Sequence, residues 1–392
     1  MSDLSEITKA IEASNAALEQ FKLSKNAEID TLKTQLETAE AKQNRREFFE
    51  APETVSLDGL KTLRTPAEIK SHYQARAKEH DEESVGLADF LRGVAGMKAT
   101  PLATKALAEG TNSTGGYAVP NLLQSSILQA LVPASSLMVA GCGIVPLNPG
   151  ATTTFAAIDT IPTAAWRAEG GAVAESDPAF RAVVATPRSL AFLFKISREL
   201  LADGSDVDNA LRTAIAQAFA KELDRAGLRG SGSAPEPKGL LNTTGIQAVT
   251  NGTNGTALAG YANLFSAVAA ILAANAPMPT AAIMSPRSLV KLGGLVDTLG
   301  QPIRVPEMLL KTQLIATSQI PNNLTVGTSS DCSEIYVGDF TRMAFAMREN
   351  VSILVADQLY AATGQIAFIG HVRADVIVTY PTAFGVVTGV RA

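Results

Sequence analysis

The sequence predicts an α+β protein in two parts, a charged helical segment up to about residue 110 and a low-charge body after it. The first 110 residues hold 15 basic and 19 acidic side chains, whereas the remaining 282 hold 18 and 19. The first part shows helical periodicity, and the second mixes helical patterns with β-branched and aromatic runs without strict alternation. A chain of 392 residues is long enough for two or more structural units.

A coiled coil is predicted at the start of the chain. Steps of three and four residues place a mostly apolar set on one stripe of a helix: Leu4, Ile7, Ile11, Ser14, Leu18, Phe21, Ile29, Leu32, Leu36 and Ala39. Two steps of four through Lys25 form a stutter that locally unwinds a supercoil. After Pro52, a second charged helix is expected over residues 66–92.

Residues 97–116 have the composition of an exposed linker, because Pro and Gly residues stand there among Ala, Thr, Ser and Lys. Segments of this kind are preferred sites of proteolysis. We therefore expect a cut within this stretch, with Lys105, Gly110 and Thr111 as the candidate processing residues.

The body begins with a predicted helix over residues 120–132, followed by an apolar run up to Pro149. Residues 152–161 and 180–196 are rich in Thr, Val, Phe and Ile, and they enclose a stretch with glycines and acids. This pattern predicts a long hairpin with a flexible tip.

A long helix follows, because apolar side chains recur every four residues up to Gly227: Val207, Leu211, Ile215, Phe219 and Leu223. Turns are expected over residues 229–260, and helices over 264–276 and 285–299. Strands are expected over residues 281–284, 335–337, 343–347, 351–354, 365–380 and 384–390.

Patterns typical of catalytic and ligand sites are missing from the body. The glycine-rich residues 230–233 have no Lys for a phosphate loop and no Gly where a nucleophile elbow needs it. Asp203, Asp206 and Asp208 lack the Gly and the distant Glu of a calcium loop, so helix capping explains them better. We expect no enzyme activity, no cofactor and no metal.

Composition argues against other classes of protein. The formal net charge is −5 and Trp166 is the only tryptophan, which does not favour specific nucleic-acid recognition. Cys142 and Cys332 are 190 positions apart, and with the histidines at positions 72, 80 and 371 they show no zinc-ligand spacing, so no zinc site is expected. The apolar stretches are interrupted before they could span a bilayer, and no secretory signal follows Met1, so we expect no membrane contact and assembly in the cytoplasm.

Three stretches resemble the major capsid proteins of tailed phages, which have the Hong Kong ninety-seven type fold. Residues 115–120, Gly-Gly-Tyr-Ala-Val-Pro, resemble the start of that family's N-arm. Residues 166–175 look like the tip of its extended loop. Residues 197–201, the helix up to Leu223 and the Gly and Pro turn up to Leu241 are similar to its spine helix and the turn after it. The order of parts resembles this family over the whole chain.

The resemblance implies a structural subunit of an icosahedral head that forms pentamers and hexamers, assembles into a procapsid and matures around double-stranded DNA. It implies as partners other copies of the chain, a portal, a maturation protease and DNA bound by non-specific contact only. Its domains would be a cleaved scaffolding segment at 1–110, an N-arm at 111–150, an extended loop at 151–196, a peripheral domain at 197–234 and 341–370, and an axial domain at 235–340 and 371–392. The loop tip would contact neighbours through Trp166, Arg167, Glu169 and Glu175.

Some members of this family join neighbouring subunits covalently through a lysine in the extended loop. In this chain residues 168–180 contain no Lys, and Lys195 lies on a predicted strand at the base of the loop. We therefore expect no isopeptide bond between subunits.

Three alternatives to a capsid subunit remain. An encapsulin shell would leave the N-terminal coiled coil and charged helix without a role. An enzyme with an oligomerising helix would need a constellation of nucleophile, base or metal that the sequence lacks. A coiled-coil adaptor would account for residues 1–50 but not for the low-charge body.

Overall fold

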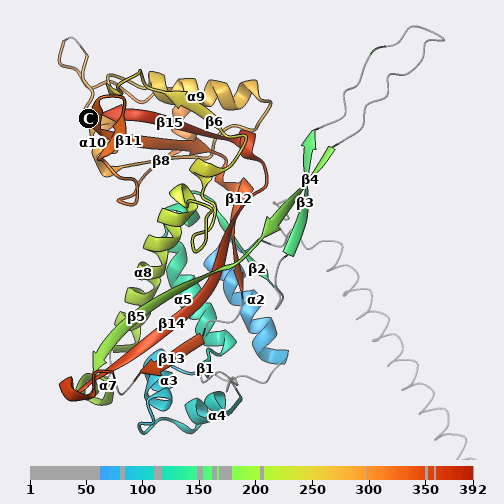
Figure 1. The fold of residues 1–392 in the computed structure, drawn as a ribbon, viewed down its shortest axis with the longest axis vertical. Coiled ribbons are helices and arrows are strands. Elements are labelled where there is room, and N and C mark those ends of the chain that lie inside the picture. Colours follow the sequence, from blue (N-terminus) through green and yellow to red (C-terminus); the bar gives the residue numbers. More distant parts are fainter. Residues whose placement is uncertain are drawn as a thin grey trace, which may run out of the picture. The chain divides into compact units, whose positions relative to one another are not determined.

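The computed structural model describes residues 62–79, 84–109, 117–147, 153–160, 166, 179–203, 207–297, 299–348, 352–356 and 359–391. The chain divides into two compact units, Met1–Thr54 and Val55–Ala392, and every described residue belongs to the second. The predicted coiled coil therefore lies outside the described residues. The second unit contains both helices and sheets, as predicted (Figure 1).

A six-stranded sheet in the described part of the chain is organised around one long strand, β14 (Gln365–Val378). On one side β14 pairs antiparallel with β5 (Arg188–Ser197) over ten residues. On the other side its first half pairs with β13 (Ser352–Ala356) and its second half with β12 (Met343–Arg348). The outer strands are β1 (Tyr117–Ala118) beside β13 and β2 (Gly143–Leu147) parallel to β12.

Helix α8 (Val207–Arg229) runs alongside this sheet together with α5 (Asn121–Ala134) (Figure 1). Its 23 residues span about 34 Å at 1.5 Å per residue. The predicted apolar stripe turns inward, since Ile215, Phe219 and Leu223 are buried. Phe219 meets Phe192 of β5 edge to face at 4.6 Å between ring centroids, so this helix packs directly on the sheet.

A seven-stranded sheet forms the other half of the unit, with the order β6-β15-β11-β8-β9 and with β7 and β10 beside β15 and β11. Its strands are β6 (Gln247–Thr250), β7 (Thr256–Ala257), β8 (Ala281–Met284), β9 (Gln313–Ala316), β10 (Leu324–Val326), β11 (Ser329–Gly338) and β15 (Phe384–Arg391). Helix α9 (Ala262–Ala273) packs on β15, β6 and β11. Because β14 continues to Val378 within the first sheet, the chain changes sheets near residue 380, later than the expected domain boundary at residue 371.

Shorter elements connect these layers. They are the helices α6 (Ser136–Val139), α7 (Arg198–Asp203) and α10 (Pro286–Gly293), and the 3-10 helices Leu240–Asn242, Glu307–Lys311, Phe340–Arg342, Ala361–Thr363 and Pro381–Ala383. Helix α10 ends at Gly293–Gly294, so the helix predicted up to residue 299 is six residues too long. Glycine loses more conformational freedom in a helix than other residues, and two in succession favour the stop.

The predicted hairpin is present only in part. Strands β3 (Thr153–Thr160) and β4 (Ala179–Ala185) pair antiparallel, but the second predicted strand breaks after Ala185 and continues as β5 in the six-stranded sheet. At the break the Thr186 backbone N–H donates to a carboxylate oxygen of Asp375 at 2.7 Å, and Pro187 has no N–H to offer to a strand ladder. These two features redirect the chain.

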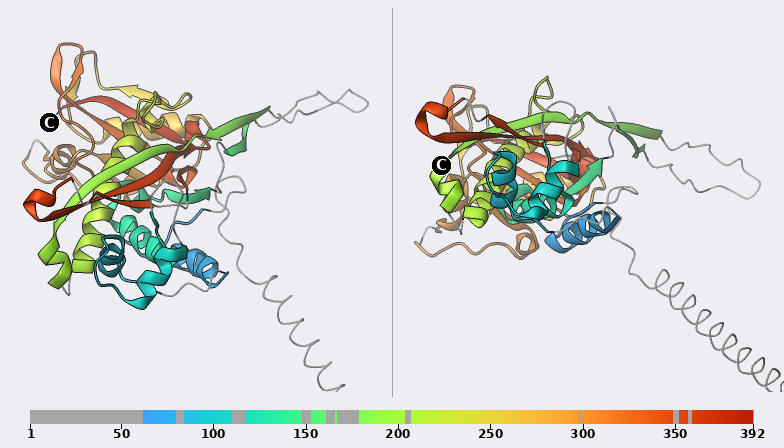
Figure 2. Two further views of the ribbon diagram at one scale, coloured as in Figure 1. Left: turned by 60° about the horizontal axis from the view of Figure 1, so that its bottom comes forward. Right: turned by 90° about the horizontal axis from the view of Figure 1, so that it is seen from below.

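The N-terminal part of the unit is packed against the body, so the charged helical segment predicted up to residue 110 is not separate from the body over residues 62–109. Helices α2 (Pro66–Glu79), α3 (Leu87–Val94) and α4 (Pro101–Glu109) occupy this stretch. Helix α2 lies against α5, and α3 contacts α8 (Figure 2). Buried side chains of these helices and of the residues before α2 share the main core with the body: Leu63, Ile69, Tyr73, Leu87, Phe90 and Leu91. The many charges lie on the outer faces of short amphipathic helices, so charge density does not mark the packing boundary.

Backbone and side-chain hydrogen bonds reinforce this packing. Leu63 exchanges two 2.8 Å backbone hydrogen bonds with Ile144, which extends the free edge of β2. Thr65 and Glu68 form a reciprocal cap at the start of α2. At the start of α3, the Ala88 N–H donates to Asp208 of α8 at 2.7 Å. The N-terminal helices are thus an integral layer of the fold.

A buried carboxylate ties α8 to the junction between α5 and α6. Asp224 accepts hydrogen bonds from the Ser135 hydroxyl at 2.5 Å, from the Ser136 hydroxyl and backbone N–H, both at 2.7 Å, and from the Leu137 N–H at 3.3 Å. Burial raises the pKa of Asp224, and these hydrogen bonds oppose that rise. Because the partners are themselves buried or half-buried, removing the carboxylate leaves several polar groups unpaired.

We expect Asp224→Ala to lower the free energy of unfolding of unassembled subunits by about 3 kcal/mol, since buried donors lose their acceptor. Urea denaturation followed by circular dichroism measures the change. Lys221→Ala is the matched control because Lys221 is exposed on the same helix, and it should change stability by less than about 0.5 kcal/mol. Equal stability of the two variants would contradict the role of Asp224.

Candidate assembly surfaces

The β3–β4 hairpin is an arm that leads away from both sheets (Figures 1 and 2). Its pairing begins with Thr153 opposite Ala185 and ends with Thr160 opposite Ala179. Buried side chains anchor its base in a small core of its own, made of Val145, Leu147, Ala185, Ala344, Ala346 and Ile377. An arm with a packed base and a projecting end is suited to contact another molecule.

Trp166 stands between the two strands of this arm in the sequence and has the full exposure of an isolated side chain, 105 %. A fully exposed indole is unusual for a residue that is usually well buried. Arg167, Glu169 and Glu175, the other residues expected at the loop tip, lie outside the described residues. Of the four expected contact residues, Trp166 alone is therefore placed.

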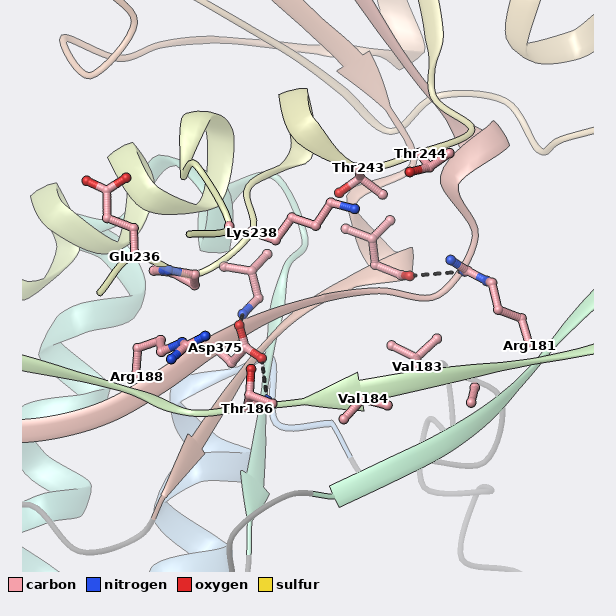
Figure 3. A pocket seen from close by; sticks show the side chains of 15 residues that line it. Arg181, Val183, Val184, Thr186, Arg188, Glu236, Lys238, Thr243, Thr244 and Asp375 are labelled. Carbon is pink, nitrogen blue, oxygen red and sulfur yellow. Dashed lines mark hydrogen bonds between the residues drawn. The ribbon is translucent and has the colours of Figure 1, made fainter. Parts of the chain in front are cut away.

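A cavity of about 340 Å³ opens at the base of the arm (Figure 3). It is lined by β4, the start of β5, the turn after α8 and β14. Arg181 donates to the carbonyl oxygens of Thr379 at 3.0 Å and Val378 at 3.4 Å. Burial raises the pKa of Asp375, although its carboxylate accepts from the N–H groups of Thr186 and Val376. Arg188 and Lys238 add two further positive charges to the lining.

A second cavity of about 220 Å³ adjoins the first, since Arg188, Glu236 and Pro237 line both. Its wall is mainly aliphatic and formed by Leu190, Leu223, Ala226, Pro235, Pro237 and Ala374. The two neighbouring cavities are together called the spine groove here, and they lie between the C-terminal end of α8 and strands β5 and β14.

The turn that forms one wall of the spine groove is held in place by Arg225. Its guanidinium donates to Glu222 at 2.6 Å and to Glu236 at 2.8 Å, and the Ser231 N–H also donates to Glu236. The hydrogen bond from Arg225 is the main cause of the lowered pKa of Glu236. A Cβ atom at Gly230 would lie 2.3 Å from the carbonyl oxygen of Pro237, so only glycine permits this close turn.

Of the three expected processing residues, the structure describes only Lys105, and it lies on a helix and not in an open linker. Lys105 is exposed on α4, which continues to Glu109, while Gly110 and Thr111 lie outside the described residues. Ala103 of the same helix is fully buried. The helix forms because residues 101–109 are rich in Ala and Leu after an N-terminal Pro, a signal that outweighs the linker composition.

Other sequence expectations concern individual side chains. Lys195 is on β5, as expected, and its amine lies 5.3 Å above the ring of Tyr360. Cys142 and Cys332 are buried free thiols, and burial raises the pKa of Cys142. Among the described residues no cluster of His, Cys, Asp and Glu suits a metal ion. In that same part of the chain, no helix has the length and apolarity required to cross a membrane.

The profile of the phage capsid family matches residues 115–389, which is well over half of the chain. The chain belongs to the phage capsid family. This capsid protein is therefore a structural subunit of a phage head shell, located in the virion capsid, and it associates with copies of itself. The predicted resemblance is confirmed on the part of the chain that forms the two sheets.

Solved shells share the fold of this capsid protein. The capsid of an empty GTA particle has a TM-score of 0.52 at 19 % identity, covering 66 % of this chain and 90 % of that one. Mycobacterium phage Adephagia gives 0.51 at 17 %, covering 66 % and 90 %, and Mycobacterium phage Cain gives 0.51 at 16 %, covering 64 % and 89 %. The search of curated proteins finds no match. About a third of this capsid protein lies outside each of these structural alignments.

The spine groove and the Asp224 tie could not be predicted from the sequence. Arg188 and Lys238 are 50 residues apart, and only the pairing of β5 with β14 and the fold of the turn bring them together. The sequence did contain one local signal for the wall of the groove. Glu222 and Arg225 stand three residues apart, a spacing at which side chains on one helix form an ion pair. No comparable local signal marks Asp224, whose partners precede it by almost 90 residues.

We expect a cut introduced near Gly110 to leave the N-terminal fragment bound to the body, because its core side chains are buried and each contributes about 1.5 to 3 kcal/mol. A specific protease site inserted after Gly110 makes the cut, and gel filtration with and without urea measures retention. Tyr73→Ala should weaken retention, whereas Leu102→Ala, a change at a 39 % exposed side chain of α4, should not. A fragment that separates under native conditions would contradict the expectation.

Proposed function

We propose that this capsid protein forms pentamers and hexamers that assemble into a procapsid, with residues 1–110 as an internal scaffolding segment. The family match begins at residue 115, directly after that segment, and this observation carries the proposal. The scaffold then has two parts, residues 1–54 as a separate unit and residues 62–109 as a layer bound to the body. A maturation protease removes the segment or part of it, and the portal and packaged DNA complete the particle.

We propose a division of the body into four parts. The N-arm takes residues 111–150, the extended loop 151–196, the peripheral domain 197–234 and 341–370, and the axial domain 235–340 and 371–392. The seven-stranded sheet supports the axial assignment, with β14 as the exception because it stays in the six-stranded sheet to Val378. Arms that reach several neighbours produce many weak heterologous contacts, which close a shell cooperatively.

Contact with DNA is non-specific in this proposal. The formal net charge of −5 and the near balance of acids and bases in the body do not favour strong electrostatic binding of a duplex. An enclosed genome requires only that the inner wall does not repel it strongly. Recognition of a particular DNA sequence is not part of this function.

Truncation separates the two parts of the scaffold. Deleting residues 1–54 should leave the urea midpoint of subunits unchanged but give aberrant or open particles in negative-stain electron microscopy, because the separate unit no longer directs assembly. Deleting residues 1–109 should also lower the midpoint, because it uncovers apolar core surface on α5 and α8. Normal closed shells from both deletions would overturn the scaffolding role, and a small monodisperse oligomer from the full chain would overturn shell assembly.

Mature shells should contain no covalent links between subunits. Residues 168–180 provide no lysine, and Lys195 lies at the base of the arm on β5. Heated and reduced samples of finished particles should therefore run as a single subunit band on denaturing gels. Any ladder of higher bands would contradict this expectation, and comparison with the Lys195→Arg variant would then show whether the crosslink uses Lys195.

A further inference from the structure

The sole tryptophan of the chain is fully exposed. Trp166 follows the end of the β3–β4 pairing, in a body whose other large aromatic side chains include many of its most buried ones. Burying a tryptophan side chain removes about 150 to 250 Å² from water, so a binding site for it on another molecule would be strongly favourable. Exposed tryptophans of this kind are typical anchors of protein interfaces.

The apolar half of the spine groove suits such an anchor in size and lining. Cavities of about 150 Å³ bind benzene in other proteins, so one of about 220 Å³ has room for the larger indole ring. Leu190, Leu223 and Pro237 offer aliphatic faces to the ring, and the Arg225 network with Glu222 and Glu236 keeps the wall in position. The site is thus formed before any partner arrives.

The polar half of the groove has an excess of positive charge. Three bases, Arg181, Arg188 and Lys238, line it with two acids, Glu236 and Asp375. Glu236 is engaged by Arg225, and Asp375 accepts from two backbone N–H groups and is also attracted by the positive charge of Arg188. The side chains of Arg188 and Lys238 make no hydrogen bond to another residue that the structure describes, and Figure 3 shows both facing the cavity. This half therefore favours an acidic ligand.

The chain carries a segment with both properties. Glu169 follows Trp166 by three residues, and Glu175 and Asp177 follow in the same loop, which has no lysine. Three residues span at most about 10 Å. A tryptophan in the apolar cavity would therefore bring Glu169 within reach of Arg188, which lines both cavities.

We propose that Trp166 of one copy inserts into the apolar cavity of the spine groove of a second copy, while Glu169 of the same loop pairs with Arg188 and Lys238. The occupant belongs to another copy because Trp166 is fully exposed in its own chain and so does not fill its own groove. This contact is a detail of the shell assembly proposed above and rests on it, but it can be measured without shells.

A peptide titration tests the contact on unassembled subunits. Trp166→Phe protein has no tryptophan, so a synthetic peptide of residues 161–178 is then the only source of indole fluorescence. Binding should move its emission to shorter wavelength and protect it from acrylamide. Arg188→Glu in the same protein should weaken binding at least about tenfold. Lys221→Glu, a charge change on exposed α8 outside the groove, is the matched control and should have no effect.

A charge exchange tests the same contact in assembly. Arg188→Glu and Glu169→Arg should each raise the subunit concentration needed for shells at least about tenfold, and the double variant should restore it in part. Peptide that binds equally well to the Arg188→Glu and control proteins, or does not bind at all, would overturn the inference. So would wild-type shells in which Trp166 keeps the emission of a solvated indole. Failure of the wild-type chain to form shells while the peptide binds would count against the assembly proposal alone.

Discussion

The fold depends on the pairing of β14 with three other strands. Its fourteen residues join β5, β12 and β13, which lie between residues 188 and 356 of the chain, into one sheet. The long helix α8 packs on that sheet, and the turn after α8 then faces β14 across the spine groove. The direction of the arm follows from the same strand, because Asp375 of β14 holds the point at which β4 becomes β5. Loss of this pairing would separate the arm, the long helix and the N-terminal layer together.

Much of this architecture could be predicted from the sequence where local pattern and burial agree. Helix α8 ends within two residues of its predicted end because its apolar side chains recur every four residues. Strand β8 could be predicted because its four residues form a short, continuous run of small and apolar side chains, which is typical of a buried strand. The arm was predicted as an element, but the break at Thr186 was not, since it depends on a hydrogen bond to Asp375 almost 190 residues later. Helix α10 was predicted too long because apolar spacing continues past the two successive glycines that end it.

The N-terminal layer shows why charge density is a poor guide to packing. Short helices can bury one stripe and still carry charges on most of their surface, so the composition of residues 62–109 resembles that of a solvated segment. What decides their placement is the complementary apolar surface of α5 and α8, and the sequence of the segment alone does not contain it. The candidate contact site likewise depends on parts of the chain that are distant in the sequence. Trp166 was identified from its own position, but the groove emerges only when β5, β14 and the turn after α8 are assembled.

The two thiols have a consequence for the durability of the particle. Cys142, directly before β2, and Cys332 in β11 are both enclosed in the interior, are not paired, and lie at different sheets. Disulfides form in oxidising surroundings and are reduced in the cytosol of most cells. A shell whose only sulfhydryl groups are inaccessible has the same covalent structure in both environments. The two thiols therefore neither form nor lose a disulfide when the surroundings of the shell change from reducing to oxidising.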